Sequence, residues 1–554
     1  MSKDNAALVG NLAEQLFLAP DGSNVESLHA LLRHAVDAAL MHQGEGPLYS
    51  GRPLAEEDED SGLWRLPEEG NPPDESLAQL PQFLRGCVKP HHPFLAKNII
   101  PLPSFVYLAA YSAASLFMGN GVTGEDAAAA LGAELQCAAA LADLAGYEPD
   151  GAAGVFTFGG TGTNLYAFKV GLSKADRGST LNGVTTRGVY IGSWPSHYSH
   201  RTASTWLGVG RESYVTVPSL TDQTTDLVEL EKSCRRAIED GARIYGIIGA
   251  GGTTSNMAID DFTAIAAMRD ELVRHYALDY RPHIHADAVL GWAYLPFLSY
   301  DLSANPLGFS RPVCVKLGRL VSRLRTLRHA DSMGIDFHKT GYVPYTSSMV
   351  LLRDRRDLGL LRRDGSDMTP LFHDPKAYNP GVYTLETSRS TANMIATWLT
   401  LRTLGRDGLR RLLGNALENA EAVREHLRRR MISDLVVVNQ VSYGPDTFIR
   451  CYPPARAPRD HNLEWSSDRL VQIGNDYNSA FFSWLASRSG TWTEFLAVSK
   501  TSAAFYCATG QPVVALRVYS LNPGMGRADA RELVDRLIDA KREFDEAVPS
   551  VEGS

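Results

Sequence analysis

Short apolar runs that alternate with longer helical patterns constrain the fold of this chain most strongly. Three runs have the character of buried strands: 189–193 (VYIGS), Arg243–Ala250 (RIYGIIGA) and His283–Asp287 (HIHAD). Between the last two, residues 262–277 carry apolar side chains at helical spacing. The strand–helix–strand order predicts an α/β fold with a mostly parallel central sheet that helices cover. Polar motifs that follow such strands should then gather at the carboxyl edge of the sheet.

The two ends of the chain depart from this central pattern. Residues 1–45 look helical, with Leu28, Leu31, Leu32 and Val36 at helical spacing, and residues 46–81 are rich in proline, glycine and acid, which favours a solvated arm. Residues 392–413 have the pattern of a long helix, and beyond about 415 strand-like runs mix with helices. The expected strands and amphipathic helix are 435–440, 447–452, 513–519 and 530–548. We predict an N-terminal helical segment and acidic Pro-rich arm over 1–90, a large domain over 91–413 and a smaller α+β domain over 414–554.

Charge and cysteine content exclude several classes of protein. The chain has 54 Lys and Arg against 63 Asp and Glu, a net charge of −9, which disfavours a general nucleic-acid binder. No basic-then-apolar signal segment opens the sequence, and no run of about 18 apolar residues predicts a spanning helix. The six cysteines are scattered without a CxxC pair, which favours reduced thiols in the cytoplasm over a disulfide framework or a zinc site.

A glycine-rich turn, FGGTGTN over 158–164, precedes a helical pattern. Glycines allow the backbone to approach an anion closely, and the free N–H groups of a helix N-terminus bind phosphate. A tight connection without a ligand is the alternative. The Gly-Lys-Ser/Thr ending of a P-loop is missing.

Three further motifs follow strand-like runs. WPSHYSH contains His197 and His200, GGTT spans 251–254, and HADA ends at Ala288. A histidine here can stack on a planar cofactor or move protons, or it can be a loop residue without a role; the two histidines also suggest a metal, but no third ligand is evident, and we predict no metal. Asp287 at the end of a buried strand needs a cation, for which a protonated ring nitrogen would serve; a metal ligand or a helix cap is the alternative.

A lysine completes the series. Lys339 follows His338 in the weakly charged stretch ADSMGIDFHKTGYVPY. A lysine in a packed site can lose its proton and attack a carbonyl, whereas a lone lysine is ordinarily a surface residue. Phosphate turn, stacking histidine, ring-nitrogen aspartate and nucleophilic lysine together are what pyridoxal phosphate requires.

In this order the motifs resemble those of the group II pyridoxal-phosphate-dependent amino-acid decarboxylases, relatives of the glutamate, aromatic-amino-acid, histidine and tyrosine decarboxylases. The resemblance runs from about residue 91 to 540. The matching motifs are GGTGTN with Thr161 and Asn164, His197-Tyr198-Ser199, Gly252-Thr253-Thr254, His285 to Ala288, Asp331-Ser332 through His338-Lys339, Ser388-Arg389, and Leu516-Arg517 through Asn522-Pro523.

The resemblance implies a fold-type I transferase whose large domain over 91–413 binds pyridoxal 5'-phosphate. It implies that Lys339 carries the cofactor as a Schiff base, that Asp287 pairs with the pyridine nitrogen and that His197 stacks on the ring. Further implied cofactor contacts are Thr161, Gly162, Asn164, Thr253 and His338.

The same resemblance implies the substrate contacts and the assembly. Arg517 would bind the substrate carboxylate, and His92, in an early His-Pro segment, would lie near the substrate entrance, although a simple turn explains it equally well. A tyrosine on a loop after the lysine would protonate the product; Tyr378 is our choice and Tyr383 the other candidate. The family implies a cytoplasmic homodimer with active sites at its interface and no nucleic-acid or membrane partner.

Two features depart from the family pattern. Val289 stands two places after the aspartate, where relatives usually have a small residue that packs on the ring. Asp287 and Lys339 are also unusually far apart, and the surplus lies at 302–329. That stretch has an apolar stripe, which predicts either an amphipathic surface helix or a docking face for a second subunit. The stripe consists of Leu317, Leu320, Val321, Leu324 and Leu327, with Arg319, Arg323 and Arg325 beside it.

We expect decarboxylation of an L-amino acid to its amine and carbon dioxide. Neutral or aromatic side chains suit the motifs, which bring no extra basic cluster to the site. Decarboxylative oxidative deamination, carbon–carbon lysis and aminotransfer on the same fold are the alternatives, because loop groups decide the fate of the carbanion. A non-catalytic binding or regulatory relative is a third reading, which the presence of both Lys339 and Asp287 disfavours.

Overall fold

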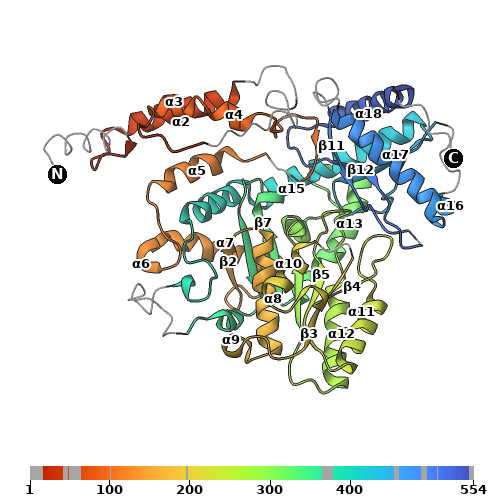
Figure 1. Ribbon diagram of the computed structural model, residues 1–554, viewed down its shortest axis with the longest axis horizontal. Helices are drawn as coiled ribbons and strands as arrows, with labels where there is room; N and C mark the ends of the chain where they lie inside the picture. Colours follow the sequence, from red (N-terminus) through yellow and green to blue (C-terminus); the bar gives the residue numbers. More distant parts are fainter. Residues whose placement is uncertain are drawn as a thin grey trace.

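A seven-stranded sheet forms the centre of the computed structural model, which describes residues 16–41, 48, 64–99, 102–194, 197–364, 378–454, 461–487, 496–507 and 509–547 (Figure 1). The strand order is β2-β8-β7-β6-β5-β3-β4. Only β8 runs antiparallel to its neighbours, so the predicted mostly parallel sheet is confirmed. The strands are β2 (Ala153–Thr157), β3 (Gly188–Ser193), β4 (Tyr214–Val217), β5 (Arg243–Ala250), β6 (His283–Asp287), β7 (Ser332–Asp336) and β8 (Ser348–Leu352).

Helices cover both faces of this sheet because its central strands are apolar on both sides. In β5, Ile248 packs with residues of α8 on one face, whereas Ile247 packs into the larger core on the other. Helices α8 (Gly160–Ala175) and α10 (Ser199–Trp206) cover the first face. The second face is covered by α7 (Leu131–Ala145), α11 (Leu227–Glu239), α12 (Phe262–His275) and α13 (Arg311–Leu324).

A second sheet lies beside the first, in the order β1-β11-β12-β10-β9 (Figure 1). Its strands are β1 (Leu95–Ala96), β9 (Leu435–Val437), β10 (Asp446–Cys451), β11 (Ala497–Thr501) and β12 (Ala515–Tyr519), and α16 (His461–Trp465), α17 (Asp468–Ser487) and α18 (Arg527–Ala547) accompany them. The first strand comes from the N-terminal part of the chain, so this sheet is not built from residues after 414 alone. The division of the chain into three domains stays a prediction.

The long helix α15 (Thr391–Arg430) connects the two sheets. It bends at Gly405, which has a positive φ of 57°, and continues well past residue 413, where the sequence pattern placed its end. Its second half buries Leu413, Leu417 and Ala420 on one side while its other side is charged. Because many residues after 413 are charged, the spacing of apolar residues did not indicate that the helix continues.

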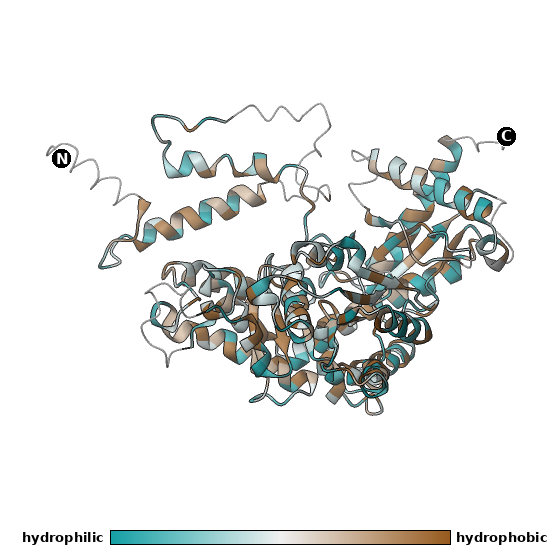
Figure 2. Cartoon of the chain, turned by 60° about the horizontal axis from the view of Figure 1, so that its bottom comes forward, coloured by the Kyte–Doolittle hydropathy of each residue, from teal (hydrophilic) through white to brown (hydrophobic). Residues whose placement is uncertain are grey.

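The N-terminal helices stand clear of both sheets. Figures 1 and 2 show α2 (Val25–Leu40), α3 (Pro73–Leu77) and α4 (Leu80–Leu84) apart from the body of the molecule, above α5 (Phe105–Ser115) in the first view. Helix α2 confirms the helix predicted within 1–45 over the part that is described, and it buries no residue of its own. Residues 1–15, 42–47 and 49–63, which include part of the predicted arm, lie outside the described residues.

The apolar stripe at 302–329 is buried in the chain's own core. Helix α13 and the turn after it place Leu317, Leu320 and Leu324 against the second face of the large sheet, all with no exposed surface. The prediction of an amphipathic surface helix is therefore confirmed. The alternative, a docking face made by this stripe, is wrong because the same chain already covers it.

One helical stretch, Gly124–Ala145, is long and apolar enough to cross a membrane by length and composition. It comprises α6 (Gly124–Ala127), a 3₁₀ turn and α7, and α7 packs on β2 with Leu131, Leu141 and Ala142 in the core. Its middle holds the buried Glu134, which forms an ion pair with Arg389. These contacts make it a core helix of this fold.

Removing the Glu134 carboxylate should destabilise the protein strongly. Glu134 has no exposed surface, pairs with the buried Arg389 and accepts a 2.7 Å hydrogen bond from the Phe156 N–H. Glu134→Ala leaves a buried guanidinium uncompensated, which should lower the free energy of unfolding by about 3–5 kcal/mol in urea denaturation followed by circular dichroism. Asp407→Ala, which breaks an exposed pair with Arg411, should cost less than about 1 kcal/mol. Equal losses in the two variants would contradict the importance of the buried pair.

Candidate active site

The carboxyl ends of β3, β5, β6 and β7 border a cavity of about 620 Å³. The motifs that the sequence placed after strands meet here, as the parallel topology requires. The residues that line it are Gly159, Gly160, Thr161, Asn164, Ser193, His197–His200, Ile248–Ala250, Gly252–Thr254, Asp287, Val289, Asp336, His338, Lys339, Tyr345 and Thr346.

Lys339 is the nucleophile-bearing residue of this cavity. It lies on the single turn α14 (Phe337–Thr340) directly after β7, and its Nζ is 2.8 Å from Oδ2 of Asp336. Burial by itself lowers the pKa of the Lys339 ammonium, but the carboxylates of Asp336 and Asp287 outweigh it, so that the pKa lies above its usual value. The raised pKa favours the protonated form of Lys339, which pairs with Asp336.

Asp287 is held by a histidine from another element. Nε2 of His200, on α10, donates a hydrogen bond of 2.8 Å to Oδ2 of Asp287. Burial would raise the pKa of Asp287, but the hydrogen bond and charge of His200, together with Lys339, hold this pKa well below its usual range. The other oxygen, Oδ1, is buried and has no hydrogen-bond partner among the described residues. Asp287 is thus an ionised carboxylate with one acceptor atom still to be satisfied.

The glycine turn opens α8 at the edge of the cavity. Gly159 has a φ of 107°, which favours glycine, and a Cβ on Gly160 would lie 2.8 Å from Oδ2 of Asp336. No side chain caps the N-terminus of α8. The N–H groups of this first turn are therefore available as donors beside the cavity, and the phosphate site that the sequence suggested stays a prediction.

The remaining predicted cofactor residues reach the cavity in different ways. His197 and His338 line it, and burial lowers the pKa of both imidazoles, which favours their neutral forms. Thr253 lines it too, with its hydroxyl bonded to the Ser255 carbonyl. Asn164 borders the cavity but uses its side chain internally, donating to Ser199 and facing Nε2 of His285 at 3.0 Å.

Four predicted residues are not among those that line the cavity. Gly162 is buried one step further along α8. Arg517, on β12, donates to Ser499 Oγ, and the Nδ1 of His92 accepts from the N–H of Phe94. The Tyr378 hydroxyl donates to Glu134 at 3.0 Å. The predicted roles of these residues stay predictions.

Sequence reasoning missed Asp336, His200 and Tyr345. Asp336 ends a buried strand just as Asp287 does, so the argument that selected one carboxylate would also have selected the other. His200 was considered only as part of a metal pair with His197; in the structure its ring faces Asp287 and Tyr214 instead. Among the described residues, no group of three or more His, Cys, Asp and Glu side chains is placed to hold a metal ion.

A known protein family matches most of the chain. A family model described as the pyridoxal-dependent decarboxylase conserved domain matches residues 67–444. The chain is 27% identical to an L-2,4-diaminobutyrate decarboxylase of Rhizobium meliloti over 328 residues, which is 59% of this chain and 57% of that protein. It is 27% identical to an L-tyrosine decarboxylase of Enterococcus faecalis over 255 residues, 42% of this chain and 39% of that one. The chain thus spans about half the length of the curated relatives that it matches.

Solved structures share the fold over almost the whole chain. The apo form of mouse CSAD superposes with a TM-score of 0.75 at 19% identity, covering 93% of this chain and 99% of that one. Oryza sativa TDC with PLP and tryptamine superposes with a TM-score of 0.73 at 16% identity, covering 95% and 99%. At these identities the likeness establishes the fold, and the predicted fold-type I architecture is confirmed.

Proposed function

The chain belongs to the pyridoxal-dependent decarboxylase family, and we propose that it is a pyridoxal-phosphate-dependent enzyme that converts an L-amino acid to its amine and carbon dioxide. The observation that carries this proposal is the ion pair of Lys339 with Asp336 in a cavity that Asp287 also lines. Two carboxylates around a single amine match a cofactor that brings both an aldehyde and a protonated ring.

The residues of the cavity fit pyridoxal phosphate. The uncapped N-terminus of α8 suits the phosphate, the unsatisfied Oδ1 of Asp287 suits the N–H of a pyridinium, and Lys339 suits the aldehyde. When bound, the cofactor supplies an electron sink for the bond that breaks. Thr161 and His338 would hold the phosphate, and His197 would cover the ring.

The chain's own residues direct protons and charge in the site. Asp287 remains ionised because of His200 and so keeps a proton on any ring nitrogen that it contacts. Lys339 must lose its proton before its amine can bond to an aldehyde. Until then Asp336, whose Oδ2 is 2.8 Å from Nζ, stabilises the positive charge of the ammonium. Val289 lines the same cavity.

The proposed substrate is an L-amino acid. No cluster of charged residues in the cavity selects a side chain of the opposite charge. Arg517, buried on β12, is proposed to bind its carboxylate, and Tyr378 to donate a proton after carbon dioxide leaves. Product analysis across a panel of amino acids separates the classes: amine with carbon dioxide supports decarboxylation, whereas aldehyde with oxygen consumption supports oxidative deamination.

Replacing Lys339 should abolish turnover without unfolding the protein. Lys339→Ala removes the amine that bonds to the cofactor, so carbon dioxide release from the best substrate should fall by at least about 100-fold. The absorbance of the purified protein above 400 nm, roughly where a protonated cofactor adduct absorbs, should disappear with it. Lys232→Ala, at an exposed pair with Glu229, is the control and should behave as the wild type. Unchanged turnover in Lys339→Ala would refute the site assignment.

We further propose a cytoplasmic homodimer with its active sites at the interface. Helices α2 and α4, which extend from the body, and α5 expose large apolar side chains, and exposed apolar surface of this kind marks interaction sites when it is contiguous. The exposed fraction is 54% for Val36 and 44% for Leu40 on α2, 74% for Phe83 on α4 and 89% for Phe105 on α5. A second copy of the chain is the occupant that the family suggests for this surface.

Charge placed on the exposed face of α2 should weaken the dimer. Light scattering on a size-exclusion column should give twice the 60.5 kDa of one chain for the wild type. Val36→Asp combined with Leu40→Asp should shift the mass toward one chain, because burying two carboxylates costs several kcal/mol. His34→Asp, on the opposite side of the helix, should leave the mass unchanged. A monomeric, active wild type would overturn the proposal.

A further inference from the structure

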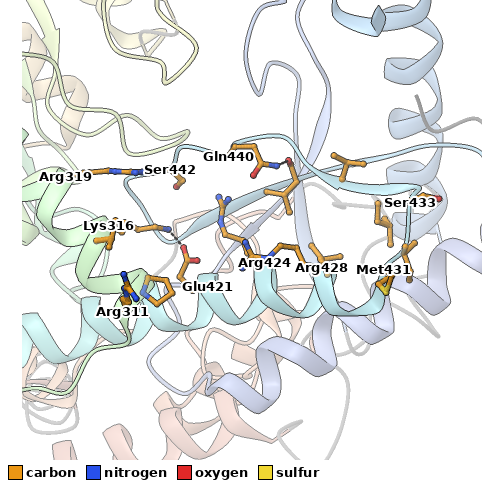
Figure 3. A pocket seen from close by; sticks show the side chains of 17 residues that line it. Arg311, Lys316, Arg319, Glu421, Arg424, Arg428, Met431, Ser433, Gln440 and Ser442 are labelled. Carbon is orange, nitrogen blue, oxygen red and sulfur yellow. Dashed lines mark hydrogen bonds and ion pairs between the residues drawn. The ribbon is translucent and has the colours of Figure 1, made fainter. Parts of the chain in front are cut away.

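A second cavity, of about 610 Å³, lies between α13, the second half of α15 and β9 (Figure 3). It shares no lining residue with the active-site cavity. The charged side chains that line it are five cations and one carboxylate: Arg311, Lys316, Arg319, Arg424, Arg428 and Glu421. The cavity is large enough for a small metabolite.

Positive charge in this cavity is only partly neutralised. Lys316 pairs with Glu421 at 2.7 Å, and both Nη groups of the buried Arg424 donate to Asn439, while its Nε has no hydrogen-bond partner among the described residues. The exposed Arg319 and Arg428 form no ion pair within the part of the chain that is described. Burial, together with the neighbouring Arg424, lowers the pKa of Lys316. An anion in the cavity would relieve this repulsion.

We propose that the cavity binds a small organic phosphate, at a site separate from the active centre. Guanidinium groups donate two parallel hydrogen bonds to phosphate oxygens, and three of the five cations, Arg311, Arg319 and Arg428, are exposed to solvent. One wall is α13, which lies between β6 and β7 of the large sheet, and the other is β9 of the second sheet. The ligand would therefore contact both parts of the molecule.

Calorimetric titration with pyrophosphate tests this site. The protein is first incubated with pyridoxal phosphate and dialysed, so that the active-site anion position is filled. Arg319→Glu combined with Arg428→Glu should raise the dissociation constant at least about tenfold, since each lost contact is a charge-assisted hydrogen bond. Arg325→Glu is the matched control, because Arg325 is exposed, follows α13 and does not line the cavity.

Three outcomes would overturn the proposal. They are an undetectable binding heat in the wild type, equal affinity in the wild type and the double variant, and tighter binding of citrate than of pyrophosphate at equal ionic strength. The last result would assign the cavity to carboxylates instead of phosphates. Loss of binding in the double variant with retention in Arg325→Glu supports the site.

A different observation carries a second inference, about the support of Asp287. His200 has a side chain that is only 4% exposed, with Nε2 at 2.8 Å from Asp287 and Nδ1 at 3.1 Å from the Tyr214 hydroxyl. The Tyr214 ring stacks near Phe168, and Gly192 leaves room for its hydroxyl, since a Cβ there would lie 2.3 Å from that oxygen. Tyrosine, histidine and aspartate thus form one hydrogen-bonded row that ends at the cavity.

We infer that His200, oriented by Tyr214, is a positioning residue that holds Asp287 ionised and turns its free Oδ1 toward the ring nitrogen of the cofactor. This inference rests on the proposed function. In the tautomer with the proton on Nε2, the imidazole donates to Oδ2 and accepts from the Tyr214 hydroxyl, so Oδ2 is occupied and Oδ1 is the acceptor left for the ligand.

Cofactor binding by three variants tests the role of His200. His200→Leu should weaken pyridoxal phosphate binding about tenfold or more in an absorbance titration, because the carboxylate of Asp287 loses the hydrogen bond that Oδ2 accepts from His200. His200→Gln, which keeps a donor near the Nε2 position, should restore most of the affinity. Tyr214→Phe should give a smaller loss in the same direction.

The pH dependence has a definite sign. The charged or titratable groups that face Asp287 are His200, His285, His197 and Lys339. Without His200, burial raises the pKa of Asp287. Binding to His200→Leu should therefore weaken as the pH falls from about 8 to 5, whereas the wild type holds its affinity over more of this range.

An analogue with carbon in place of the ring nitrogen separates positioning from general stability. With it, the difference in dissociation constant between wild type and His200→Leu should shrink to about twofold or less, because there is no ring N–H for Asp287 to accept. Equal binding of pyridoxal phosphate by wild type and His200→Leu, or an equal deficit with the analogue, would overturn the inference while leaving the proposed function intact. A wild type that takes up no pyridoxal phosphate would overturn both.

Discussion

Two carboxylates at the ends of neighbouring strands are the constraint on which the rest of this site depends. Asp287 ends β6 and Asp336 ends β7; the side chain of Asp336 is 1% exposed and that of Asp287 is 12% exposed. Taking ionised carboxylates out of water costs several kcal/mol each unless they meet positive charge. Lys339 interacts with both, and His200 supports Asp287 from the opposite side. The carboxyl edge of the sheet is therefore stable only if β6, β7, α14 and α10 keep the relative positions that these contacts require.

The two carboxylates are held differently, and this difference divides their chemistry. Asp336 accepts a hydrogen bond of 2.6 Å from Ser348 on Oδ1, and its Oδ2, which has no hydrogen-bond partner among the described residues, forms an ion pair with Lys339. Trp292 adds a hydrogen bond from its indole to the Asp336 carbonyl, which fixes the end of β7. Asp287 has a partner on one oxygen alone. Asp336 is consequently suited to control the charge of the lysine, and Asp287 to receive a group from the ligand.

The local sequence pattern predicted individual strands but not the contacts between residues far apart in the chain. The strands Arg243–Ala250 and His283–Asp287 have the predicted bounds, because a continuous apolar run between polar turns leaves little choice of register. Helix α15 was predicted too short, since its second half buries only one side. The contact between His200 and Asp287 joins residues 87 positions apart, which no spacing rule connects. Asp336 was within reach of the sequence, because it satisfies the rule that selected Asp287.

The long connection between Asp287 and Lys339 meets two physical demands. Its apolar residues, among them Trp292, Phe297 and Leu320, are fully buried under the large sheet, so the segment adds to the core that fixes β6 and β7. Its opposite side carries Arg311, Lys316 and Arg319 toward the second sheet. The element that joins the two carboxylate-bearing strands is therefore also one wall of the cationic cavity. A ligand there shifts the active site only if it binds two arrangements of this wall with different affinity.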